Sequence, residues 1–220
     1  MKKNKIKTQS SIGYIVNNFI TGCKFGMTLG TTGSWFNFKT MPDDISDLGE
    51  VHFMDLNGTS VPYIYNPGAC AGMNMPIAMS LALTNFKTMQ VHLLIFVDDT
   101  FMKMSPIAQK FIISHEYGHI INHHLEKMSD DQIKWCEERG LNRSEIVSGT
   151  SFKQLKLLSE MSQAVRSFKY EAEADAFGAS VVGVVAARNS LREMYKITPI
   201  ICRNKRFKED VKNRLDALCK

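Results

Sequence analysis

The pattern of apolar and polar positions changes near residue 100 of the chain. Before it, short apolar stretches alternate with Gly, Asn and Pro, which is typical of strands joined by turns. A small antiparallel sheet is therefore predicted, covering one side of the helical part that follows. Its strands are expected at 34–38, 51–54, 61–65 and 91–97, while 79–83 fits a short helix or a strand.

After residue 100, apolar residues recur every three or four positions, as on one face of a helix. The first such helix has Ser105 as its N-cap and Pro106 at its first position, where the missing N–H costs nothing. Further helices are predicted at 129–140, 155–168 and 207–218. The predicted fold class is therefore α+β, with helices dominating the C-terminal part.

The helix that begins at residue 106 carries the sequence His-Glu-Tyr-Gly-His at 115–119. Residues four apart share a helical face, so His115 and His119 can present their imidazoles to one metal ion. Glu116 is placed to reach a water on that ion. This HExxH pattern is the zincin signature of two zinc ligands and a general base. Gly118 costs about 1 kcal/mol relative to alanine in a helix interior, which indicates a close crossing by a neighbouring helix.

The next histidines along the chain are poor candidates for a third ligand. His123 lies four residues beyond His119, but successive helical turns swing away from a single point. We interpret His123 and His124 as a solvated helix end, where histidine also suits the helix dipole. Leu125 stands where a metzincin would have its third histidine.

A better candidate lies in the acidic stretch Glu-Ala-Glu-Ala-Asp at 171–175. Glu171 and Asp175 are four apart and share a helical face, whereas Glu173 is expected to point away. Gluzincin peptidases use this ExxxD pattern: the glutamate ligates zinc and the aspartate accepts a hydrogen bond from a ligating histidine, which fixes the imidazole orientation. Glu171 is therefore the predicted third ligand, and Asp175 is its supporting carboxylate.

Three stretches of the chain together resemble the gluzincin peptidases of the HtpX and CAAX-prenyl-protease type, in a soluble minimal form. They are the strand-like segment 91–101, the HExxH segment 105–124 and the acidic segment 170–179. The resemblance implies a zincin-like fold in which a small antiparallel sheet packs on the HExxH helix. It also implies that 91–97 is an edge strand that pairs with an extended peptide.

The same resemblance implies an endopeptidase with one Zn²⁺ per chain and a polypeptide substrate. Zinc is expected on His115, His119 and Glu171, with Glu116 as the general base that takes a proton from the attacking water. All six histidines precede Glu171, so the group that stabilises the oxyanion stays open. It is a histidine from the N-terminal half or one of four other residues: Tyr170, Arg188, Arg192 and Tyr195.

Two alternatives remain beside this interpretation. The chain is also similar to the ImmA/IrrE peptidases that cleave repressors, although 52 positions separate His119 from Glu171 and the spacing in those peptidases is usually shorter. The other alternative is a catalytically weak zinc-containing protein that acts by binding a partner.

Composition agrees with a compact enzyme. With 220 residues, 44% hydrophobic and 22% charged, the sequence predicts a single domain over 1–220. The net charge of +5 is spread over both ends, which does not favour a nucleic-acid partner. Five scattered cysteines without a CxxC pair indicate free thiols in a reducing compartment, and a cytoplasmic location is expected.

No transmembrane segment is expected. The longest apolar run downstream of the N-terminus, 176–187, falls short of the roughly 20 residues that a spanning helix needs. Its small residues permit close helix packing instead. We predict that this run belongs to the helix that carries Glu171, buried against the HExxH helix near Gly118.

Overall fold

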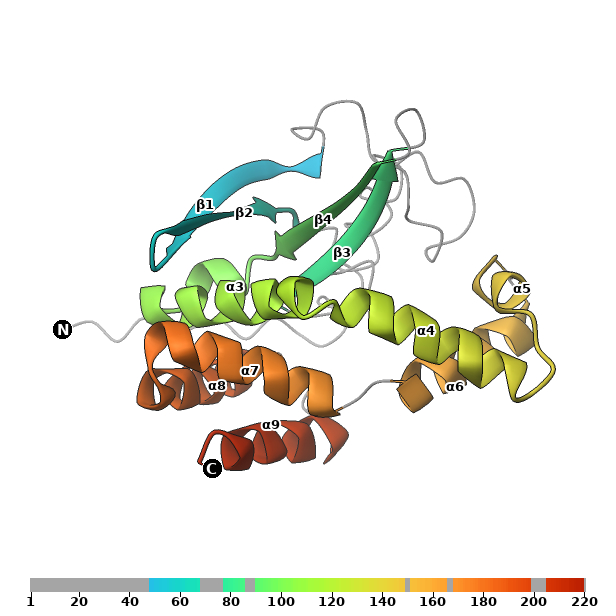
Figure 1. Ribbon diagram of the computed structural model, residues 1–220. Coiled ribbons are helices and arrows are strands. Elements are labelled where there is room, and N and C mark those ends of the chain that lie inside the picture. Colours follow the sequence, from blue (N-terminus) through green and yellow to red (C-terminus); the bar gives the residue numbers. More distant parts are fainter. Residues whose placement is uncertain are drawn as a thin grey trace.

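A four-stranded sheet lies on one side of helix α3 (Pro106–Ile121), and helices α7 (Phe168–Val182) and α8 (Val184–Ile197) lie on the other (Figure 1). This computed structural model describes residues 48–67, 77–85, 90–148, 151–165, 168–198 and 205–219. The strands are β1 (Glu50–Leu56), β2 (Thr59–Tyr65), β3 (Ala78–Asn85) and β4 (Gln90–Val97). The remaining helical elements are η2 (Phe101–Lys103), α4 (His124–Glu137), α5 (Arg143–Ser148), α6 (Phe152–Val165) and α9 (Lys205–Ala217). The predicted α+β class is confirmed.

The sheet has the order β1-β2-β4-β3 and is mixed. Strands β1 and β2 form an antiparallel hairpin, and so do β3 and β4, but β2 runs parallel to β4. The prediction of a fully antiparallel sheet is therefore wrong for the central pair, β2 and β4. Because β3 takes the outer position, its hairpin partner β4 lies next to β2 and points in the same direction.

The prediction that 91–97 is an edge strand is also wrong. Strand β4 lies between β2 and β3, and its residues Ile95, Phe96 and Val97 are almost fully buried. A continuous apolar run of this kind is typical of an inner strand that is covered on both faces. The strand beyond it at that side of the sheet is β3, which contains the ambiguous segment 79–83. The strand predicted at 34–38 lies outside the described residues.

Helix α3 is buried on several sides because it lies between the sheet and the other helices. Five consecutive residues, 111–115, are buried, and a helix that is apolar most of the way round is typical of such a position. Ser105 is at the N-cap as predicted, but its hydroxyl does not cap α3. Its backbone N–H and its hydroxyl each donate to the Glu193 carboxylate of α8, both at 2.6 Å.

Helices α3 and α7 cross at two glycines. A Cβ on Gly118 would lie 3.1 Å from the Cα of Ala174 and 3.3 Å from the Cβ of Phe177. A Cβ on Gly178 would lie 2.8 Å from the ring of Phe111, which is fully buried. The predicted close crossing at Gly118 is confirmed, and the two backbones approach so closely because neither glycine carries a side chain.

Several predicted helix boundaries need correction. The apolar run 176–187 is split, because Gly183 adopts φ 88° between α7 and α8. Helix α4 begins at His124, not near 129, since the chain turns at His123 with φ 57° and continues as a helix. Of the described residues in 155–168, those up to Val165 belong to α6 and Phe168 begins α7. The breaks at His123 and Gly183 each depend on a single positive-φ residue, which helical periodicity does not report.

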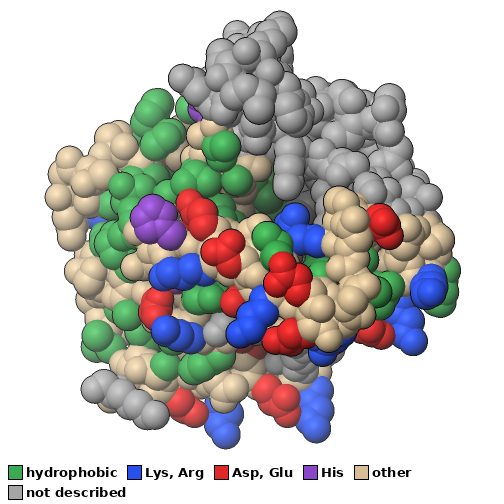
Figure 2. All heavy atoms as spheres, turned by 45° about the vertical axis from the view of Figure 1, so that its right-hand side comes forward, with side chains coloured by type: hydrophobic (Ala, Val, Ile, Leu, Met, Phe, Trp, Pro, Cys, Tyr) green, Lys and Arg blue, Asp and Glu red, His purple; other side chains and the backbone are tan. Residues whose placement is uncertain are grey.

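Helices α4, α5 and α6 extend away from the sheet and form a second, smaller apolar cluster with Cys136, Ile146, Leu158 and Met161 at its centre. On the described part of the face drawn in Figure 2, acidic and basic side chains are interspersed rather than gathered by sign. In the part of the chain that the structure describes, every helix is too short or too polar to span a membrane.

The substitution Gly178→Ala tests the helix crossing. Alanine favours a helix by about 1 kcal/mol over glycine, but the new methyl group would overlap the buried Phe111 ring, and overpacking costs about 1–3 kcal/mol. We expect a net loss of stability of up to about 2 kcal/mol in urea unfolding. Ser180→Ala, on the exposed side of α7, should change stability by less than about 0.5 kcal/mol.

A double mutant tests the contact itself. Because the new methyl group would meet the Phe111 ring, Phe111→Leu should relieve part of the stability lost in Gly178→Ala. Full additivity of the two changes would contradict it.

Candidate metal centre

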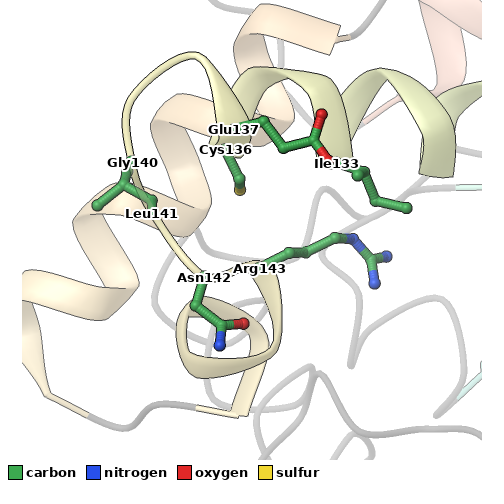
Figure 3. A pocket seen from close by; sticks show the side chains of 7 residues that line it. All are labelled: Ile133, Cys136, Glu137, Gly140, Leu141, Asn142 and Arg143. Atoms are coloured by element: carbon green, nitrogen blue, oxygen red, sulfur yellow. The ribbon is translucent and has the colours of Figure 1, made fainter.

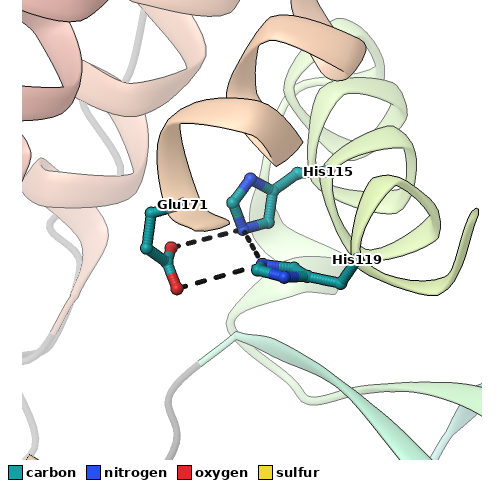
Figure 4. A group of neighbouring side chains, drawn as sticks. All are labelled: His115, His119 and Glu171. Carbon is teal, nitrogen blue, oxygen red and sulfur yellow. Dashed lines mark hydrogen bonds and ion pairs between the residues drawn. The ribbon is translucent and has the colours of Figure 1, made fainter. Parts of the chain in front are cut away.

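Three side chains from two helices converge on one point between α3 and α7 (Figure 4). The Nε2 atoms of His115 and His119 lie 3.1 Å apart. The carboxylate of Glu171 lies 3.5 Å from the first nitrogen and 3.9 Å from the second. Two ligand atoms about 2.1 Å from a tetrahedral zinc ion are roughly 3.4 Å apart, so the spacing fits such an ion. His115, His119 and Glu171 thus form a group that could hold a metal ion.

Asp175 lies where the sequence predicts it, behind one of the histidines. Its Oδ1 is 2.9 Å from Nδ1 of His115, and the carboxylate is fully buried. A hydrogen bond from Nδ1–H to this carboxylate leaves Nε2 without a proton and directed at the ligand group. Asp175 therefore sets both the tautomer and the orientation of His115.

Arg214 of α9 is a site residue that the sequence analysis missed. Its Nε donates to Oδ2 of Asp175 and its Nη2 to Oδ1, each at 2.7 Å, which is the bidentate geometry of a strong ion pair. Its Nη1 also lies 3.4 Å from Glu171. The signal was present in the sequence: Arg214 stands three residues after Val211, on the buried stripe of the last helix.

The charges of this network shift several pKa values. Burial alone would raise the pKa of Asp175, but the Arg214 guanidinium and the hydrogen bonds hold it well below its usual range. Burial, reinforced by His115, lowers the pKa of His119 to about 3, so this imidazole is neutral at pH 7. Burial and Arg214 oppose protonation of His115, yet the carboxylates of Asp175 and Glu171 outweigh them and raise its pKa.

Glu116 is half-buried on α3, next to His115 in the chain. Burial raises the pKa of its carboxyl group, with Glu171 adding to the rise, while the Ser80 hydroxyl of β3 donates a hydrogen bond to it. A carboxylate with a raised pKa is a stronger base than one in water. Glu116 is thus held by the sheet, beside the ligand group and outside it.

The prediction for His124 is wrong. His123 is 72% exposed, as expected for a solvated helix end, but His124 is fully buried. Its Nδ1 lies 2.9 Å from Nδ1 of His119, and its Nε2 lies 2.9 Å from the Glu173 carboxylate. The chain does not leave the helical region at 123; it turns there and directs the next residue back toward α7. Glu173 is outside the ligand group, as expected, but it is bonded to this histidine.

Three of the four residues considered for oxyanion stabilisation have other roles in the described contacts. The hydroxyl of Tyr170 donates to Asp131 of α4 at 2.9 Å, and the Tyr195 ring stacks on Phe207. Arg192 donates to Asn189, and the buried Nε of Arg188 has no hydrogen-bond partner among the residues that the structure describes. The sequence does not identify the oxyanion donor, and the described contacts do not assign that role to any of the four.

A surface hollow lies near the far end of α4, at the turn into α5 (Figure 3). The guanidinium of Arg143 is bonded there to Gln132 through two N–H groups. None of the lining residues belongs to the ligand group, so this hollow does not extend the candidate site. They are Ile133, Cys136, Glu137, Gly140, Leu141, Asn142 and Arg143.

Comparison with known proteins identifies no similar protein. A scan against models of protein families finds no match, and neither does a search of curated proteins or of solved structures. What the chain does must therefore be inferred from its own site.

Removing Arg214 should destabilise the fold strongly. Arg214→Leu leaves the buried Asp175 carboxylate without its cation, and breaking a buried ion pair in this way costs about 3–5 kcal/mol. Urea unfolding in the presence of a chelator would measure the loss independently of any metal. Lys212→Leu, an exposed cation of the same helix, is the control and should change stability by less than about 0.5 kcal/mol.

The loss of stability caused by Arg214→Leu should depend on pH. In the wild type, the depressed pKa of Asp175 stabilises the fold above the ordinary carboxyl value of 3.8, and this contribution is lost as pH falls below it. Without Arg214, burial raises the pKa of Asp175, so this carboxyl group takes up a proton at a higher pH than in the wild type. Once it is neutral it no longer needs a cation, and the substitution then costs less stability. The stability gap between variant and wild type should therefore narrow from pH 7 to pH 4. A gap independent of pH would contradict the ion-pair account.

Proposed function

We propose that this chain is a zinc-dependent endopeptidase of the gluzincin kind, with the zincin-like arrangement of the HtpX and CAAX-prenyl-protease type. The observation that carries the proposal is the position of Glu116. A structural metal site needs no base, yet this half-buried carboxylate with a raised pKa adjoins a group of two imidazoles and one carboxylate. That donor set matches the three protein ligands of catalytic zinc sites, which leave a fourth position open.

The proposed reaction is hydrolysis of a peptide bond by water. Zinc held by His115, His119 and Glu171 would polarise the scissile carbonyl and lower the pKa of a bound water to about 7. Glu116 accepts a proton from the attacking water and then delivers it to the leaving amine. Asp175 and Arg214 keep His115 oriented through this cycle. Their buried ion pair also stabilises the site.

A polypeptide substrate is supported by the position of β3. This strand is outermost in the described sheet on the side of β4, it packs on α3, and its Ser80 contacts Glu116. An extended peptide can bind to an exposed strand through main-chain hydrogen bonds. We propose β3, rather than the strand first predicted at 91–97, as the element that would align a substrate with the base.

The variant Glu116→Gln tests the proposed role of the base. The amide has a similar shape but cannot accept the proton, so we expect zinc content to stay unchanged while cleavage of an unfolded polypeptide falls at least about 100-fold. Peptide release measured by mass spectrometry would give the rate. Glu126→Gln, an exposed position on α4, is the matched control. Cleavage by Glu116→Gln at the wild-type rate would contradict the mechanism. Absence of cleavage by the wild type as well would favour a zinc-containing binding protein.

A further inference from the structure

The two predicted histidine ligands are supported in different ways. His115 is supported directly by the Asp175 carboxylate, whereas Nδ1 of His119 faces a third histidine. That histidine, His124, is fully buried and follows a turn in which His123 has the left-handed φ of 57°. A non-glycine residue in this conformation is strained, and such strain often occurs at functional positions. Here the turn places the ring of His124 against His119.

The hydrogen-bond chain behind His119 ends at a carboxylate, and this fixes its direction. An ionised carboxylate only accepts hydrogen bonds, so Nε2 of His124 must donate to Glu173 across their 2.9 Å separation. With one proton on each ring, Nδ1 of His124 is then an acceptor. Among the described residues, Nδ1 of His124 is hydrogen-bonded to Nδ1 of His119, also at 2.9 Å, so Nδ1–H of His119 is the donor. Nε2 of His119 is therefore left without a proton, on the side of Glu171.

Neighbouring contacts hold this chain of bonds in place. The ring of Tyr170 lies against His124, with centroids 4.9 Å apart, and its hydroxyl is bonded to Asp131 of α4. Lys169 lies 3.7 Å from the other oxygen of Glu173. His124 is thus enclosed, whereas Glu173, at the end of this series of hydrogen bonds, reaches the surface with its side chain 37% exposed.

We propose that His124 and Glu173 are positioning residues of the metal centre, which together hold His119 in the tautomer that turns a bare Nε2 toward the ion. The inference rests on the proposed metal site and adds a second support to it. All three acidic residues of 171–175 then have a function: Glu171 binds the ion, Asp175 orients His115, and Glu173 orients His119 through His124.

The experiment compares wild type with Glu173→Gln and His124→Phe, using two readouts. Long-range ¹⁵N–¹H NMR on the zinc-free protein reports which nitrogen of His119 carries the proton. Competition with a chromophoric chelator gives the zinc Kd. Glu173→Gln is the main variant because its half-exposed position should leave the fold intact, as circular dichroism would verify. The matched controls are His123→Asn, which tolerates the left-handed turn, and Glu126→Gln.

We expect His119 to be protonated at Nδ1 in the wild type and to lose this preference in Glu173→Gln, because an amide can also donate to His124. The zinc Kd should rise about 10- to 100-fold in Glu173→Gln and in His124→Phe. His124→Gln, which can donate and accept, should recover part of the affinity, and both controls should match the wild type.

Two results would overturn the inference: a wild-type His119 protonated at Nε2, or zinc binding by Glu173→Gln and His124→Phe as tight as in the wild type. Failure of the wild type to bind zinc would instead overturn the metal centre itself, and the NMR readout keeps the two failures apart.

Discussion

The site depends on the close crossing of α3 and α7. Gly118 and Gly178 allow the two helices to approach until their backbones are nearly in contact, and larger residues would force them apart. His115 and His119 come from one helix and Glu171 from the other, so the distance from the Glu171 carboxylate to the two imidazoles is set by this crossing. The distances of 3.5 and 3.9 Å from Glu171 to the two histidines are a consequence of packing between small residues. The 3.1 Å between the two histidines follows instead from their four-residue spacing on α3.

Burying so many ionisable groups between helices has an energetic cost, and the network around Arg214 offsets it. An isolated carboxylate at the position of Asp175 would be driven to its neutral form by desolvation. The guanidinium keeps it ionised, so that it remains a hydrogen-bond acceptor for His115. Helix α9 is remote in sequence from both motifs, yet it provides the charge on which the orientation of the first histidine depends.

Sequence alone could predict the parts of the site that local periodicity determines. The four-residue spacings of His115 with His119 and of Glu171 with Asp175 place each pair on one helical face, and the structure brings the three predicted ligands together. The helix crossing followed from Gly118. What the sequence could not provide is tertiary: the parallel pairing of β2 with β4 depends on where β3 lies, and the burial of His124 depends on one left-handed residue.

Arg214 shows how some of the missing information could be recovered. A charged residue on an otherwise apolar helical stripe must find a partner when that stripe is buried, and the acidic stretch at 171–175 was available. Glu173 is a case that helical position alone could not predict. It lies outside the ligand group, as expected, but it is bonded to His124, which in turn is bonded to His119.

The central claim is that His115, His119 and Glu171 bind one zinc ion. The most direct test is elemental mass spectrometry of the purified protein and of the His115→Ala and Glu171→Ala variants. We expect about one zinc per wild-type chain and its loss in both variants, as for a site with three protein ligands. A wild-type protein without zinc, even after the metal is added back, would contradict it.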